Sequence, residues 1–227
     1  RRVHEVASRG IVPIVLGGDH SITWPSATAV AEHHGFGRIG IVHFDAHADT
    51  APIIDGNLAS HGTPMRRLIE SGAVPGRNFV QIGLRGYWPG ADVFEWMQAQ
   101  GMHWHLMHDI WERGMAAVLD DAVAQALDGA DALYVSVDID VLDPAHAPGT
   151  GTPEPGGITS VDLLRAVRRL VMESDVVALD IVEVAPAYDH ADLTVNAAHR
   201  VAFEALAAMA WKRRQAAGGV PTLPGRS

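Results

Sequence analysis

The feature that most constrains the fold is a regular alternation, along the whole chain, between short apolar runs and longer amphipathic segments. The apolar runs have the length of buried strands, and the amphipathic segments carry apolar residues at helical spacing. Alternating strands and helices form parallel sheets with helices packed against them. We therefore predict an α/β fold, a three-layer doubly wound parallel sheet with helices on both faces. The predicted strands are residues 11–16, 38–42, 79–84, 103–107, 132–137 and 176–181, and the predicted helices are 3–9, 24–34, 91–100, 115–127, 160–172 and 194–211, with a further helix opening at Pro64.

Length and composition narrow the class of protein. The 227 residues, 48% of them hydrophobic, suit a single domain over residues 1–227 with a well-buried core. Because the chain has no cysteine, disulfides and thiolate metal sites are excluded. The net charge of -10 argues against a nucleic-acid partner and mildly favours a cationic small molecule. The apolar runs are too short to span a bilayer, and we find no cleavable signal peptide, so we expect a cytoplasmic protein without a membrane partner.

The two ends of the chain differ from the alternating pattern of strands and helices. The sequence begins at Arg1, with no methionine, and the first residues have the pattern of the last turns of a helix running into Gly10. We therefore expect that the fold lacks its N-terminal part. At the other end, residues 215–227 are expected to form a flexible tail.

Two carboxylate clusters follow apolar runs in the same way. Asp45, His47 and Asp49 alternate directly after the second predicted strand, so an extended segment would point all three into one pocket. Such a pocket would bind a cation, although a solvated acidic loop is equally compatible with this motif alone. Asp138 and Asp140 follow a later strand with the same placement. Two distant clusters with one placement favour the cation site.

Three more residues are candidates for the same pocket, since sites in parallel sheets gather beyond the carboxyl ends of the strands. His20 follows two glycines at the end of the first strand, which makes it a candidate ligand, although most loop histidines are simply solvated. His61 precedes a predicted helix and is either an ordinary loop histidine or a proton shuttle. Glu183 follows the last strand, where it is either a salt-bridge partner or an anion that binds substrate.

Other polar and aromatic side chains are expected to have structural roles. An aspartate ahead of a proline commonly starts a turn, and three histidines around the fourth predicted strand are mostly unaccompanied by carboxylates. A neighbouring Tyr-Trp pair could wall a pocket, but packing against the core is favoured. These residues are Asp143, His103, His105, His108, Tyr87 and Trp88.

Together, three segments resemble the ureohydrolase family, the arginase and agmatinase group of binuclear manganese hydrolases. The matching motifs are residues 17–21 (GGDHS), 45–49 (DAHAD) and 136–144 (SVDIDVLDP), and the resemblance runs from the first strand to the last helix. It implies an arginase-like fold and two Mn²⁺ ions per chain. By this resemblance, one ion is held by His20, Asp45, Asp49 and Asp138, and the other by Asp45, His47, Asp138 and Asp140, with Asp45 and Asp138 bridging.

The donor set supports this reading independently of the resemblance. Four carboxylates and two imidazoles suit a pair of fairly hard divalent ions, whereas structural zinc uses fewer oxygens and often thiolates. Two ions that share one water lower its pKa toward neutrality and so provide hydroxide at working pH. That hydroxide would attack a guanidinium carbon.

The resemblance also implies roles and a substrate. Asp49 hands a proton to the leaving amine, His61 shuttles protons, and Glu183 pairs with the guanidinium group. Three loop motifs, residues 61–64 (HGTP), 149–153 (GTGTP) and 186–189 (PAYD), are similar to those of the agmatinase branch. This resemblance predicts hydrolysis of agmatine to putrescine and urea, with guanidinobutyrate or another guanidino acid as the alternative. Arg85 or Arg66 could meet the carboxylate of such an acid. The family resemblance further implies a homo-oligomer, a trimer or a hexamer.

Two other functions are alternatives to the hydrolysis of a guanidino compound. A two-metal site can also hydrolyse amides or phosphoesters, but Glu183 would repel a phosphate. An inactive, metal-binding relative or fragment with a structural or regulatory role is the second rival. The presence of every proposed catalytic residue, including His61, weakens it.

Overall fold

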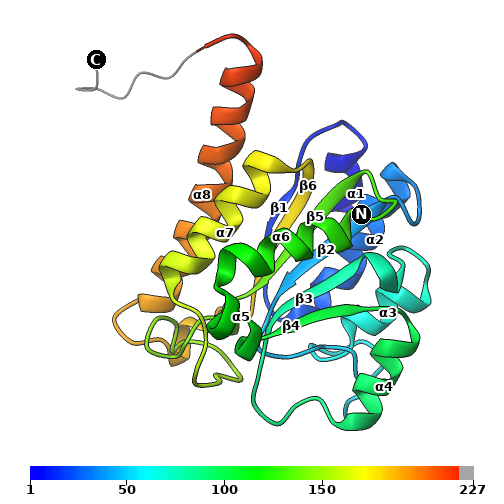
Figure 1. The fold of residues 1–227 in the computed structure, drawn as a ribbon, viewed down its shortest axis with the longest axis vertical. Coiled ribbons are helices and arrows are strands. Elements are labelled where there is room, and N and C mark those ends of the chain that lie inside the picture. Colours follow the sequence, from blue (N-terminus) through cyan, green and yellow to red (C-terminus); the bar gives the residue numbers. More distant parts are fainter. Residues whose placement is uncertain (220–227) are drawn as a thin grey trace.

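A single parallel sheet forms the centre of the protein. The computed structural model describes residues 1–219, and in it six strands lie between two layers of helices (Figure 1). Each neighbouring pair of strands is parallel. In the order β1-β6-β5-β2-β3-β4 across the sheet, the strands are β1 (Ile14–Leu16), β6 (Val176–Val182), β5 (Ala132–Asp138), β2 (Ile39–Phe44), β3 (Phe79–Leu84) and β4 (His103–Leu106).

Helices cover both faces of this sheet. One buried apolar cluster joins α5, α6, α7 and α8 to one face, and a second joins α1, α2, α3 and α4 to the other. In Figure 1, α6 and α7 lie in front of the strands and α2 lies behind them. The predicted three-layer α/β architecture is confirmed. The helices are α1 (Arg2–Ala7), α2 (Thr23–His34), α3 (Pro64–Glu70), α4 (Ala91–Ala99), α5 (Met107–Arg113), α6 (Met115–Ala126), α7 (Ser160–Glu173) and α8 (Leu193–Ala216), with short 3₁₀ turns η1 (His20–Ile22), η2 (Gly76–Asn78), η3 (Ile139–Val141) and η4 (Pro186–Tyr188).

The strand register aligns the ends of strands that are distant in sequence. Phe44 at the end of β2 is paired with Val137, one residue before the end of β5. Val137 is in turn paired with Ile181 of β6, whose other neighbour is Leu16 at the end of β1. Parallel strands present the same edge of the sheet at their carboxyl ends. The loops that follow β1, β2, β5 and β6 therefore leave the sheet side by side.

Several element boundaries differ from the predicted ones, and those of β1 and β4 have a clear physical reason. β1 begins only at Ile14, because Pro13 has no N–H to donate to the sheet, although its carbonyl accepts the N–H of Leu179 at 3.0 Å. The strand lies at the edge of the sheet, where proline is tolerated. β4 ends at Leu106, and the unpredicted helix α5 follows at once. The Asp109 carboxylate caps it by accepting the N–H of Leu106 at 2.7 Å.

The last helix continues past its predicted end at residue 211. α8 reaches Ala216, so the start of the predicted tail, Gln215 and Ala216, is helical, while residues 220–227 lie outside the described residues. Lys212 Nζ donates to the carbonyls of Ser174 at 2.6 Å and Val171 at 3.3 Å, which ties the end of α8 to the end of α7. No helix within residues 1–219 is both long enough and apolar enough to span a membrane.

Asp143 holds the loop that connects β5 to α7. Its Oδ1 accepts the N–H of Ala145 at 2.9 Å, and its Oδ2 accepts those of Gly156 at 2.8 Å and Gly157 at 3.2 Å. The bond from Ala145 is the main reason why the pKa of Asp143 lies below its ordinary value. The prediction that Asp143 starts a turn rather than binding a metal agrees with these contacts.

We expect Asp143→Ala to lower the free energy of unfolding by about 1 kcal/mol, the usual effect of removing a capping side chain. Because the folded pKa is depressed, the stabilisation is fully present above the unfolded pKa of about 3.9 and is lost as the pH falls through the folded value. Urea unfolding at pH 7 and pH 3 checks this. The control is Asp128→Ala, an exposed carboxylate with no hydrogen bond from a described residue; a difference that grows at low pH would contradict the expectation.

Candidate metal centre

His20 lies at the centre of a buried cluster beyond the ends of β1, β2 and β5. Its Nδ1 is 3.2 Å from Asp45 Oδ2, 3.0 Å from Asp49 Oδ2 and 3.1 Å from Asp138 Oδ2. η1 presents the imidazole, the loop after β2 presents the first two carboxylates, and the end of β5 presents the third. One nitrogen and three carboxylate oxygens thus face a common point, as the ligands of a divalent cation do.

A second group of ligand atoms adjoins the first. His47 Nδ1 is 3.0 Å from Asp140 Oδ2 and 3.5 Å from Asp45 Oδ1. Asp45 turns Oδ1 toward this group and Oδ2 toward His20, so it is shared by both. Asp138 belongs to the first group, and its Oδ1 accepts the N–H of Asp140 at 2.9 Å. The structure thus brings all six predicted ligands together, and bridging by Asp138 stays a prediction.

The cluster has the chemistry of a site that requires cations. His20 Nδ1 and Asp45 Oδ2 are buried and have no hydrogen-bond partner among the described residues. Burial, together with the charges of Asp140 and Asp45, raises the pKa of Asp138 well above its ordinary value. Burial alone would lower the pKa of His47, but its contacts with Asp140 and Asp45 raise it to about 11. Divalent ions would displace these protons and satisfy the open oxygens, so the donor set fits a metal centre.

Two residues of the cluster have left-handed backbone conformations. Asp49 has φ of 52° and Glu183 has φ of 62°, backbone angles that residues other than glycine rarely adopt. Glu183 is held there by its own N–H, which donates to the Gly18 carbonyl at 2.9 Å, and by its Oε1, which accepts the His20 N–H at 2.7 Å. Burial raises the pKa of Glu183. Such strain is found at functional sites, where the surrounding structure holds it in place.

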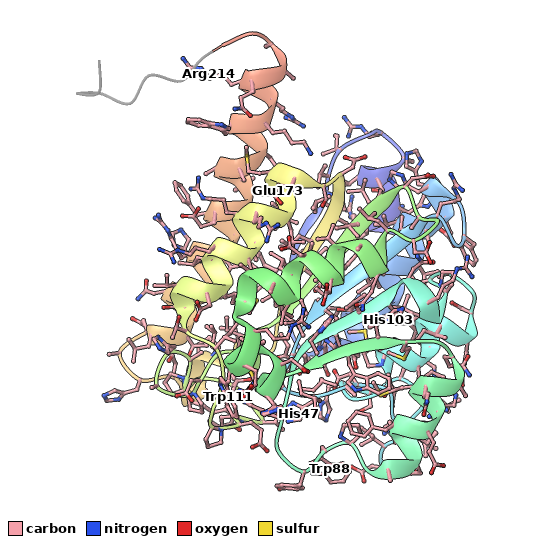
Figure 2. The ribbon with its side chains drawn as sticks, viewed as in Figure 1. His47, Trp88, His103, Trp111, Glu173 and Arg214 are labelled. Atoms are coloured by element: carbon pink, nitrogen blue, oxygen red, sulfur yellow. The ribbon has the colours of Figure 1, made fainter. Side chains whose placement is uncertain are left out.

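A cleft of about 630 Å³ opens onto this cluster. The residues that line it include Asp138, Asp140, Glu183 and His61. The His61 side chain is exposed and makes no hydrogen bond to another described residue. Figure 2 shows His47 and Trp88 at the same end of the molecule, opposite Glu173 and Arg214. The catalytic candidates and the metal ligands therefore share one opening at the carboxyl edge of the sheet.

The prediction that the Tyr87-Trp88 pair packs against the core is wrong. Tyr87 is 81% exposed and Trp88 is 62% exposed. Trp88 lines the outer part of the cleft. The turn between β3 and α4 projects away from the sheet, so the aromatic rings cannot reach the apolar clusters beneath it.

Neither arginine that was considered for a substrate carboxylate lines the cleft. Arg85 Nη2 donates to the carbonyls of Asp140 at 2.6 Å and Glu154 at 2.7 Å, and its other nitrogens also donate to backbone carbonyls. The Arg66 guanidinium stacks on Trp96 at 3.8 Å from the ring centroid. Both groups are committed to holding loops in place.

The sequence did not predict the buried residues of the sheet that contact the proposed ligands. The Gln81 amide nitrogen lies 2.6 Å from the Ala48 carbonyl and 3.0 Å from His43 Nδ1. Since an NH₂ group can donate to both, His43 accepts at Nδ1 and carries its proton on Nε2, which faces Asp45 Oδ2 at 2.8 Å. His43 forms a further group of candidate ligand atoms with His20 and Asp45, but with its proton on Nε2 it would be a neighbour of Asp45 rather than a ligand. The available signal was its position two residues before Asp45, on the same face of the strand.

The three histidines around β4 take no part in the centre. His105 Nε2 lies 3.0 Å from Gln125 Oε1, while His108 is exposed and His103 is half-buried. Within residues 1–219, none of them belongs to a group that could hold a metal ion. The prediction that they are structural or exposed is confirmed.

We expect Asp140→Asn to weaken binding of one of two divalent ions by more than ~10-fold, because it replaces a charged ligand with a neutral one. Equilibrium dialysis against Mn²⁺ with metal analysis measures this, and circular dichroism checks that the fold is kept. Asp143→Asn, a nearby carboxylate outside the cluster, is the matched control. Equal metal content and affinity in both variants would show that Asp140 is not a ligand.

Comparison with known proteins agrees with this geometry. The arginase family model matches residues 1–208. A formimidoylglutamase of Halalkalibacterium halodurans is 43% identical over 83% of this chain and 58% of its own length, and a mitochondrial agmatinase of Gallus gallus is 40% identical over 91% and 60%. The crystal structure of formimidoylglutamase from Bacillus subtilis superimposes with a TM-score of 0.87 at 33% identity, covering 92% of this chain and 64% of that one. The chain spans about three fifths of the length of these curated relatives, and it belongs to the arginase family.

Proposed function

We propose that this protein is a hydrolase that holds two Mn²⁺ ions and cleaves agmatine to putrescine and urea. Hydrolysis of a guanidino or amidino compound is supported by membership of the arginase family. The choice of manganese is supported by the four carboxylates and two imidazoles, a donor set that suits fairly hard divalent ions. The choice of agmatine rests on the charge of the cleft.

Apart from the proposed metal ligands, the carboxylates that line the cleft are Asp55, Asp92 and Glu183, and this observation carries the choice of substrate. No lysine or arginine is among its described lining residues. Agmatine has a guanidinium at one end and an ammonium at the other, so each end meets a carboxylate. A guanidino acid would place its carboxylate beside like charges without a counter-ion. The ionisable side chains that line the cleft are His47, Asp49, Asp55, His61, Asp92, Asp138, Asp140 and Glu183.

Each remaining residue has a separate task in the reaction. Two bound manganese ions would supply an activated water as the nucleophile. Glu183, with one oxygen fixed by the His20 N–H, has the other free to accept N–H groups of the guanidinium. A C–O bond forms at the guanidinium carbon, the bond from that carbon to the alkyl nitrogen breaks, and the Asp49 carboxylate takes a proton from the attacking oxygen and passes it to the leaving amine. The exposed His61 exchanges protons between the cleft and the solvent.

Urea release from agmatine, guanidinobutyrate and arginine, each offered to the manganese-loaded protein, tests the substrate. We expect release from agmatine to exceed that from the other two by ~100-fold or more in kcat/KM, since the acids place a carboxylate beside unpaired carboxylates. The metal-free protein is the control. Equal or faster hydrolysis of guanidinobutyrate would reject agmatine as the substrate, and release of ammonia in place of urea would reject the reaction.

Glu183→Gln tests the proposed contact with the guanidinium. The variant keeps the size of the side chain and the bond to the His20 N–H, but it removes the charge. We expect KM for agmatine to rise ~10- to 100-fold, the loss of one charge-assisted pair. Initial-rate kinetics measure this, and unchanged manganese affinity shows that the metal centre is intact. An unaltered KM would place the guanidinium elsewhere.

A further inference from the structure

A row of polar residues lies inside the sheet beneath the metal cluster. His43, Ser136 and Asp180 are register neighbours on β2, β5 and β6, and all three are fully buried. They lie on the sheet face covered by α2, where most of the neighbouring strand residues are apolar. Buried polar groups in a sheet are tolerated only when they are hydrogen-bonded. The partners of this row therefore show what it does.

Asp180 is surrounded by hydroxyl groups. Its Oδ2 lies 2.7 Å from Thr23 Oγ1 and 2.7 Å from Tyr134 Oη, and its Oδ1 lies 2.7 Å from Ser136 Oγ. Within residues 1–219, no basic side chain pairs with it. A carboxylate can only accept hydrogen bonds, so each of the three hydroxyls must donate its proton to Asp180. Burial and the charge of Asp180 raise the pKa of Tyr134, which keeps that phenol protonated as a donor.

One of these hydroxyls, that of Ser136, also contacts the metal cluster. Ser136 Oγ also lies 2.9 Å from His20 Nε2. A serine has only one proton, and Ser136 gives it to Asp180, so toward His20 it offers a lone pair. When His20 is neutral, as a metal ligand must be, its proton is then on Nε2. Its Nδ1, which faces three carboxylate oxygens, keeps the lone pair that a metal ion needs.

We propose that Asp180 is a positioning residue for the first metal ion, acting through the Ser136 hydroxyl to fix the proton of His20 on Nε2. The inference rests on the proposed metal centre and adds a residue that has no contact with the ion. A neutral residue could fill the same space, but it would leave the Ser136 proton free to turn toward His20 Nε2. That alternative would favour the Nδ1–H form of the imidazole, which cannot bind a metal ion through Nδ1. The carboxylate also makes His20 a more basic ligand through the chain of hydrogen bonds.

The first test is the affinity for Mn²⁺, measured by equilibrium dialysis. Asp180→Leu removes both acceptor oxygens at similar size, and Asp180→Asn keeps one. We expect one of the two ions to bind ~10- to 100-fold more weakly, as when other outer partners of ligand histidines are lost, with the larger effect for Leu. Should the Leu variant fail to fold, the Asn variant decides. Tyr134→Phe removes a donor to Oδ2 only, so it is the matched control and should stay within ~3-fold.

A double-mutant cycle separates positioning from general destabilisation. If Asp180 acts through Ser136, Asp180→Asn should change the metal affinity by less than ~3-fold once Ser136→Ala is present, whereas independent effects would multiply. The ¹⁵N spectrum of the Zn²⁺-loaded protein supplies a second readout. The wild type should show a protonated His20 Nε2 with a slowly exchanging proton, and that proton should exchange faster in the Asp180 variants.

The possible outcomes are distinct. If the wild type binds no divalent metal, both the proposed centre and this inference fail. If it binds two ions and the Asp180 variants bind them equally well, the centre stands and the inference is wrong. Losses that multiply in the cycle, or an equal loss in Tyr134→Phe, would also overturn it, because Asp180 would then act on the fold rather than on His20.

Discussion

Four carboxylates from distant parts of the chain lie within one buried cluster, and much of the structure around them serves to hold them there. Buried like charges repel one another strongly, because little water remains to screen them. Contacts with Asp140 and Asp45 raise the pKa of His47, and burial raises the pKa of Asp138, so both groups favour protonation when no metal is bound. The ions that would neutralise the cluster are therefore also expected to stabilise the folded chain.

The parallel sheet solves the problem of bringing these groups together. β2 and β5 are neighbours, although about 90 residues separate them, and their paired ends place Asp45 beside Asp138. A loop alone would need many hydrogen bonds to fix the relative positions of these carboxylates. The strands fix them through the backbone hydrogen bonds that already hold the sheet together. Loops then provide the remaining groups, and Asp143 and Arg85 hold the segment that follows β5.

The interior of the sheet also takes part in the site. Its polar row interrupts a mostly apolar layer, and hydrogen bonds with buried neighbours orient His43 and Ser136. Gln81 fixes the proton of His43, and Ser136 is oriented by Asp180. By our proposal, such an arrangement places the proton of His20 on Nε2, so that Nδ1 can bind a metal ion. The cost is a set of buried polar groups that contribute little to hydrophobic stability.

The sequence by itself determined the class of fold and the identity of the cluster residues. Apolar periodicity predicts the strands and helices. Asp45, His47 and Asp138 can be identified as candidate ligands because they lie at or just beyond the ends of predicted strands. It could not show the strand order, since hydrophobic patterns do not say which strands pair. Nor could it show that Trp88 is exposed, that Arg85 is occupied by carbonyls, or that Asp180 reaches His20 through Ser136. These facts depend on contacts between residues far apart in the chain, and only the tertiary structure decides those.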